Sequence, residues 1–299
     1  MELVNIVDEY GNRMHYKRYQ GRTFHPDVIG NVGDHLAEVA AYKGQPDDVL
    51  LCTFPKSGTH WVFNMVQMIR GNNLEYSGTP VVMEFHPISD IEKLQSPRMY
   101  LTHAAYPFIP DAAKRGDIKI IQVMRNPKDS VLSFYEFFKS MRNMAYEGTF
   151  DGFLKYFLSD EFVGVGCSLF TYLKEWEEAK RNNKDLQILN LRYEDLKKNL
   201  FENVIKISKF LNLERTSSFL HEVEKNVSFE RLKKKHDTQT GETDRWKNNT
   251  EGGRLPVYRK GIVGDWKNTF TVAQNEKFDA VYKEKMEEMR LPLDEFIFE

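Results

Sequence analysis

The sequence predicts an α/β fold, in which one domain holds a central parallel sheet flanked by helices. Short apolar runs that are typical of strands alternate with stretches of helical periodicity, and no long linker interrupts them. A chain of 299 residues that is 41% hydrophobic can also enclose one large core. We therefore expect residues 1–299 to form a single domain.

The elements are expected in the following order. Residues 1–45 are polar and contain several glycines, which predicts irregular structure. Apolar runs predict strands at 49–54, 98–103, 118–124 and 186–192. Helical spacing predicts helices at 61–70, 127–142, 200–211 and 275–290, the second of them capped by Asn126. The polar stretch 233–256 predicts a long surface loop, and loops of that length often act as mobile lids.

The segment TFPKSGTHW, residues 53–61, is the most informative part of the chain. It follows the first predicted strand and precedes a helical pattern, so it predicts a P-loop-like strand, tight loop and helix. Backbone N–H groups of such a loop converge with the positive end of the helix on one spot, which suits a phosphate-like anion. Lys56 adds a full charge there. The glycine spacing and Gly-Lys-Ser/Thr ending of a Walker A loop are missing.

Four polar side chains follow the four predicted strands. Lys56, His103, Arg125 and Tyr193 each stand just beyond a strand end. Ligands of open α/β sheets bind beyond the carboxyl ends of the strands, so these residues are expected to share a site. His103 is either a hydrogen-bonded structural histidine or a general base. Arg125, with Ser133 two turns on, forms either a surface ion pair or a phosphate site.

Two further features allow more than one interpretation. Arg259 and Lys260 run directly into Gly261, which makes either a solvated turn or a second anion clamp that the backbone can approach closely. Trp61 and Phe229 are either core aromatics or the two sides of a slot for a planar base.

Composition narrows the class of protein and its partners. A formal net charge of −2 gives no support for general attraction to nucleic acid or membranes. The N-terminus lacks the pattern of a signal peptide, and no apolar run approaches the ~20 residues of a membrane span. Cys52 and Cys167 are the two cysteines, too few for a disulfide framework, so a reduced, cytoplasmic protein is expected.

With these segments in view, the chain resembles the cytosolic sulfotransferases over nearly its whole length. TFPKSGTHW is similar to the family's phosphosulfate loop. Residues 123–129, with Ser133 and Tyr135, resemble its 3′-phosphate motif. Residues 259–267 resemble its C-terminal signature, and Lys267–Glu276 fits its short dimerisation pattern.

The resemblance implies transfer of a sulfuryl group from 3′-phosphoadenosine 5′-phosphosulfate (PAPS) to a hydroxyl or amine, leaving the product PAP, in a homodimeric enzyme that needs no metal. It implies the following cofactor-binding residues: Lys56, Ser57, Gly58, Thr59, His60, Trp61, Arg125, Ser133, Tyr193, Phe229, Arg259, Lys260 and Gly261. Lys56 and His103 would be catalytic, with His103 as the base for in-line attack on sulfur.

The acceptor is less well determined than the donor. Val82, Phe85, Phe137 and Met141 align near the family's acceptor pocket and suggest a small apolar or phenolic acceptor, although core packing explains them equally well.

Three positions depart from the family pattern. Leu101 stands where the family usually has a lysine, which puts efficiency in doubt. His60 replaces a frequent threonine and is a candidate to substitute for that lysine, or merely packs at the start of the helix. Val227 replaces a threonine that often contacts adenine.

Two other functions remain open. A non-catalytic protein that binds PAPS or PAP is the first, and Leu101 is its support. A nucleotide kinase is the second, although the loop offers neither a Walker lysine–threonine pair nor an acidic Mg²⁺ ligand.

Overall fold

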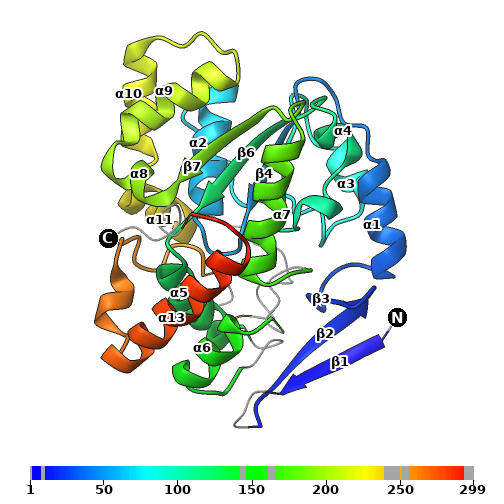
Figure 1. The fold of residues 1–299 in the computed structure, drawn as a ribbon. Coiled ribbons are helices and arrows are strands. Elements are labelled where there is room, and N and C mark those ends of the chain that lie inside the picture. Colours follow the sequence, from blue (N-terminus) through cyan, green and yellow to red (C-terminus); the bar gives the residue numbers. More distant parts are fainter. Residues whose placement is uncertain are drawn as a thin grey trace.

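The computed structural model describes residues 2–7, 11–141, 146–160, 166–238, 250 and 256–292. Its centre is a four-stranded parallel sheet in the order β5-β4-β6-β7 (Figure 1). The strands are β4 (Val49–Thr53), β5 (Met99–Thr102), β6 (Lys119–Met124) and β7 (Ile188–Arg192). The four predicted strands and their parallel arrangement are therefore confirmed.

Two hydrophobic cores sandwich the sheet, because alternate side chains of each strand point to opposite faces. Leu50 and Cys52 of β4 belong to one core, whereas Val49 and Leu51 belong to the other. The second core contains α2 (Thr59–Gly71), α8 (Tyr193–Lys198), α9 (Leu200–Phe210), α10 (Ser217–Asn226) and α11 (Phe229–Thr238). The first core contains α1 (Val32–Ala41), α3 (Ile88–Glu92), α4 (Asp111–Lys114), α5 (Pro127–Ser140), α6 (Phe150–Leu158), α7 (Leu169–Asn182) and α13 (Val272–Glu288).

Local sequence explains where the site-bearing helices begin. Asn126 caps α5 by accepting a hydrogen bond from the backbone N–H of Lys128, and Pro127 occupies the first helical position. Thr271 and Gln274 form a reciprocal capping box at the start of α13. Two short 3₁₀ helices, η1 (Tyr106–Phe108) and η2 (Asp265–Asn268), also lie within the described residues. Within the described residues, no helix is both long and apolar enough to cross a membrane.

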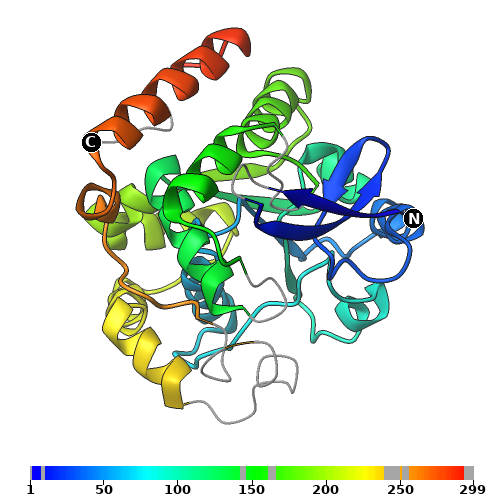
Figure 2. The ribbon, with the colours of Figure 1, turned by 90° about the horizontal axis from the view of Figure 1, so that it is seen from below.

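The N-terminal region differs from the prediction of irregular structure at 1–45. Strands β1 (Glu2–Val7), β2 (Arg13–Tyr19) and β3 (Arg22–Phe24) form a small antiparallel sheet, separate from the central one (Figures 1 and 2). Met14 and Tyr16 of β2 are buried in the first core, while their neighbours face solvent. A half-buried antiparallel strand is polar at every second residue, which is why the stretch looked irregular.

The prediction of a loop over 233–256 was also wrong at its start. Residues 233–238 continue α11, whose Leu232 and His236 are buried one helical turn apart. Most of the remaining stretch, 239–249 and 251–255, lies outside the described residues, and the lid stays a prediction.

Candidate active site

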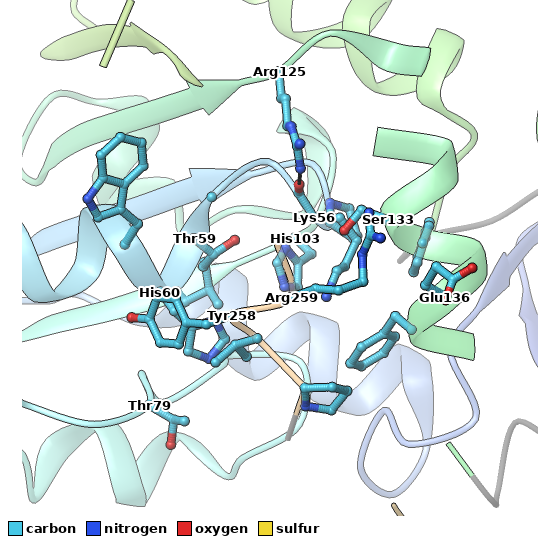
Figure 3. Close-up of a pocket in the computed structure, with 18 of the residues that line it drawn as sticks. Lys56, Thr59, His60, Thr79, His103, Arg125, Ser133, Glu136, Tyr258 and Arg259 are labelled. Carbon is cyan, nitrogen blue, oxygen red and sulfur yellow. Dashed lines mark hydrogen bonds between the residues drawn. The ribbon is translucent and has the colours of Figure 1, made fainter. Parts of the chain in front are cut away.

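A cavity of about 490 Å³ opens at the carboxyl edge of the central sheet (Figure 3). Lys56, His103, Arg125 and Tyr193, which follow the four strands, all border it, as their positions at strand ends predicted. The other sequence-predicted residues that border it are Gly58, Thr59, His60, Trp61, Val82, Phe85, Ser133, Phe137, Met141, Phe229, Arg259, Lys260 and Gly261. Ser57 does not border the cavity, and only 1% of its surface is exposed.

The loop between β4 and α2 is shaped to present backbone N–H groups. Lys56 and Gly58 have φ of 70° and 97°, both in the left-handed region, and only glycine adopts it without strain. A Cβ on Gly58 would also lie 2.7 Å from the Tyr193 ring. No side chain caps the start of α2 at Gly58. The first N–H groups of α2 are therefore left for a bound anion.

Lys56 is the cation at the centre of this arrangement. Its Nζ lies 4.2 Å from the centroid of the Phe137 ring on α5. Burial, together with the positive charges of Arg125 and Arg259, lowers the pKa of Lys56 to about 7. A bound anion would reverse this effect, because it favours the protonated amine.

His103 is held in one tautomer. Its Nδ1 lies 2.9 Å from the carbonyl oxygen of Thr53 and 3.1 Å from the Thr53 hydroxyl. A carbonyl can only accept, so Nδ1 carries the proton and Nε2 keeps a free lone pair. Burial and the charge of nearby Lys56 lower the pKa of His103 to about 4, and the hydrogen bond to the Thr53 carbonyl partly opposes this shift. The imidazole is therefore neutral at physiological pH and able to accept a proton.

The backbone at His103 is anchored by Glu84, which sequence reasoning missed. Its Oε1 accepts hydrogen bonds from the backbone N–H groups of His103 and Ala104, at 3.0 and 2.9 Å, and from the Thr102 hydroxyl. Burial raises the pKa of Glu84, against these hydrogen bonds. The sequence did hold a signal for Glu84, because it is a single acid within the apolar run 81–85. An acid in a buried segment is expected to be hydrogen-bonded.

Two buried carboxylates organise the basic residues at one end of the cavity. Asp129 accepts hydrogen bonds from the backbone N–H groups of Gly264 and Trp266, at 2.8 and 3.1 Å, and lies 3.8 Å from Arg125. Asp265 accepts hydrogen bonds of 2.9 Å from both Arg259 and Lys260. These contacts tie residues 259–266 to α5 and bring three cations together.

The aromatic residues next to this end pack edge to face. The Trp61 and Tyr193 rings lie 5.3 Å apart, and Trp61 Nε1 donates a 2.8 Å hydrogen bond to the Val227 carbonyl. Arg125 lies over the Tyr193 ring at 4.4 Å. Phe229 borders the cavity beside Gly261, whose φ is 67° and whose added Cβ would lie 2.3 Å from the Phe229 ring.

The other end of the cavity is largely apolar. Val82, Phe85, Phe137 and Met141 border it together with Leu101. Sequence reasoning missed further bordering residues: His25, Asp27, Thr79, His86, Glu136, Lys197 and Tyr258. His25 and Asp27 follow β3, so nothing in the sequence placed them here without the N-terminal sheet.

Comparison with known proteins identifies relatives across nearly the whole chain. The family model described as "Sulfotransferase domain" matches residues 46–290. Human sulfotransferase 1C2 is 30% identical over 295 residues, covering 94% of this chain and 96% of that protein. Mouse sulfotransferase 1 family member D1 is 33% identical over 277 residues, covering 88% and 92%. The crystal structure of mouse sulfotransferase SULT7A1 complexed with PAP matches with a TM-score of 0.72 at 30% identity, covering 91% of this chain and 95% of that one.

Proposed function

The chain belongs to the sulfotransferase family, and from this premise we propose that it transfers the sulfuryl group of PAPS to a hydroxyl or amine of a small apolar or phenolic acceptor. One observation carries the proposal. Lys56, the uncapped start of α2 and His103 with a free Nε2 lone pair border the same cavity. An anionic donor and an acceptor could therefore meet there.

The nucleotide end of the proposed site consists of the loop and the cation cluster. Lys56, with the backbone of Gly58 and Thr59 and the Thr59 hydroxyl, would hold the 5′-phosphosulfate, whereas Ser57 is left out because it does not border the cavity. Arg125, Ser133, Arg259, Lys260 and Gly261 would hold the 3′-phosphate, and Trp61, Phe229 and Tyr193 the nucleoside. The presence of PAP in the SULT7A1 structure supports this assignment for a homologue.

The proposed chemistry needs one proton transfer and one stabilised leaving group. His103 Nε2 accepts the proton of the acceptor hydroxyl as that oxygen attacks sulfur in line. Negative charge builds up on the bridging oxygen as the S–O bond breaks, and Lys56 and the α2 N–H groups stabilise it. The acceptor would lie against Val82, Phe85, Phe137 and Met141.

The test of this function is transfer of labelled sulfate from PAPS to a panel of phenols, alcohols, steroids and amines. We expect turnover in the wild type and a loss of about 10²- to 10⁴-fold in His103→Ala, the range for removal of a general base. PAP affinity should be unchanged in the variant, because His103 does not contact the nucleotide in this proposal.

The alternatives predict different outcomes of the same assay. Tight PAP binding with no transfer to any acceptor would favour a non-catalytic binder, for which Leu101 is the sequence support. Metal-dependent consumption of ATP would favour a nucleotide kinase. We also propose that the protein is a cytoplasmic homodimer that pairs through Lys267–Glu276.

A further inference from the structure

His60 is a cavity residue without an assigned partner. It is the second residue of α2, and its side chain borders the cavity (Figure 3). Its backbone carbonyl accepts a hydrogen bond from Asn64 Nδ2. No hydrogen bond or ion pair of the described part of the chain involves its ring nitrogens, and neither nitrogen is enclosed by protein. One imidazole N–H is therefore available to a ligand.

The charged groups that act on His60 indicate where in the cavity its side chain lies. The titratable groups whose charges reach it are Lys56, His236 and His103, whereas those that reach Lys56 include Arg125 and Arg259. In Figure 3, Arg125 lies at the top of the drawn site, and His60 lies below it, next to Tyr258. His60 is thus near Lys56 and His103, and the charges that act on it do not include those of Arg125 or Arg259.

The ring acts as a neutral group. Burial, together with the charges of Lys56, His236 and His103, lowers the pKa of His60 to about 3. A neutral imidazole offers one N–H donor and one acceptor nitrogen. His60 therefore contributes a hydrogen bond and no charge over the physiological pH range.

Strand β5 contributes no polar side chain to the lining of the cavity. Leu101 borders the cavity, and its backbone N–H and carbonyl are engaged by Val81 and Met83, at 2.9 and 2.8 Å. Of the groups near both Lys56 and His103, His60 is one that can still donate a hydrogen bond.

We propose that His60 donates its N–H to a non-bridging oxygen of the sulfuryl group as that group passes from the donor to the acceptor. This inference rests on the proposed function. The acceptor O–S bond forms while the S–O bond to the 5′-phosphate breaks, and the acceptor proton moves to His103 Nε2. The oxygen released from sulfur keeps its negative charge as part of PAP and lies beside Lys56. His60 neither gains nor loses a proton.

The experiment compares His60→Ala with His60→Asn and His60→Gln, whose amides place an N–H near the positions of Nδ1 and Nε2. We expect kcat to fall about 10- to 100-fold in His60→Ala, the effect of losing one hydrogen bond to a charged group. The Asn or the Gln variant should recover at least tenfold of that loss. PAP has no sulfuryl group, so its Kd should stay within about twofold in all three variants.

Two controls make the result specific. His221→Ala removes an imidazole that does not border the cavity, on α10, where its ring stacks on Phe201 at 3.7 Å, and should leave kcat within about twofold. Adding Leu101→Lys to His60→Ala places a new donor on the β5 wall and should raise kcat again. An equal loss of kcat in the Ala, Asn and Gln variants, or a matching loss of PAP affinity, would overturn the proposal.

A binding readout separates this inference from the proposed function. Competition of PAPS and PAP for the protein gives a ratio of affinities that does not depend on turnover. We expect His60→Ala to lower the affinity for PAPS relative to PAP about three- to tenfold, and an unchanged ratio would count against the contact. If the wild type bound PAPS but transferred to no acceptor, the proposed function would fail while this ratio still tested His60.

Discussion

At the scale of single residues, the site depends on partners far away in sequence. His103 owes its tautomer to Thr53 and the position of its backbone to Glu84. Both partners are buried, and buried polar groups keep a fixed geometry because an unpaired one is costly. The main-chain carbonyl of Thr53 and the side chain of Glu84 thus set the direction in which the free Nε2 faces.

Glu84 provides a test of this anchoring. Glu84→Ala leaves the N–H groups of His103 and Ala104 and the Thr102 hydroxyl without their acceptor. We expect a loss of about 2–4 kcal/mol in the free energy of unfolding, measured by urea denaturation, and a lower kcat with unchanged PAP affinity. Glu84→Gln keeps an acceptor oxygen and should retain most of the stability and turnover. Equal stability of the Ala variant and the wild type would contradict this role.

Lys56 makes a prediction about pH. Its pKa is about 7 in the free protein, and a bound anion raises it. Below pH 7 the amine is already protonated and adds no pH dependence to binding. Above pH 7 binding requires uptake of a proton, so the Kd for PAP should increase with pH, by up to tenfold per unit.

Calorimetry between pH 7 and 9 measures this directly, because buffers of different ionisation enthalpy report the proton uptake. Lys56→Arg stays charged throughout and serves as the control, so its Kd should lack the rise. A wild-type Kd that is constant from pH 7 to 9 would show that the pKa of Lys56 is not depressed in solution.

At the scale of elements, glycines allow loops to pass close to aromatic rings. Gly58 lies against Tyr193, and Gly261 against Phe229. Each glycine belongs to a segment that contributes cations, and each ring lies at the start of a helix distant in sequence, Tyr193 on α8 and Phe229 on α11. Close approach of backbone and ring is thus what brings the anion loop and residues 259–261 to the same ligand.

Gly261→Ala tests this close approach. The new Cβ would overlap the Phe229 ring and would also be strained at a positive φ. We expect the Kd for PAP to increase at least tenfold, with displacement of Phe229 visible in a crystal structure of the variant. Gly264→Ala is a matched control, since its φ is 78° but no atom lies within 4 Å of the added Cβ. A similar loss of affinity in both variants would assign the effect to backbone strain alone.

At the scale of the whole molecule, the cavity lies where the two cores meet at the edge of the sheet. Val272, the first residue of α13, is 76% exposed, although valine is more often buried. Val272 lies within Lys267–Glu276, so it is the position of that segment at which we test the proposed pairing of two chains.

If the protein pairs as we propose, Val272→Glu should make it monomeric, because the variant places a charge in the proposed interface. Sedimentation velocity measures the change, and PAP affinity should be unaffected. Ala280→Glu adds the same charge at an exposed position two turns further along α13 and should remain dimeric. A wild type that sediments as a monomer at micromolar concentration would refute the pairing.

The sequence by itself determined the four strands of the central sheet, four of the helices and the identity of most cavity residues. Strand and helix periodicity, the capping residues and the positions of Lys56, His103, Arg125 and Tyr193 at strand ends are properties of short segments. Parallel strands present their carboxyl ends at one edge, so these four residues could be expected to converge. The N-terminal sheet and the helical residues 233–238 were missed, because their polar faces conceal half-buried elements.

Only the tertiary structure decided the protonation of the site residues, the orientation of their side chains and which N-terminal residues reach the cavity. The tautomer of His103, the lowered pKa values of Lys56 and His60, and the anchoring role of Glu84 all depend on burial and on partners distant in the chain. His25 and Asp27 reach the cavity because β3 packs beside it, which no local pattern encodes. Desolvation and hydrogen-bond geometry arise from the packing of the whole chain, so they cannot be derived from the residues of one segment.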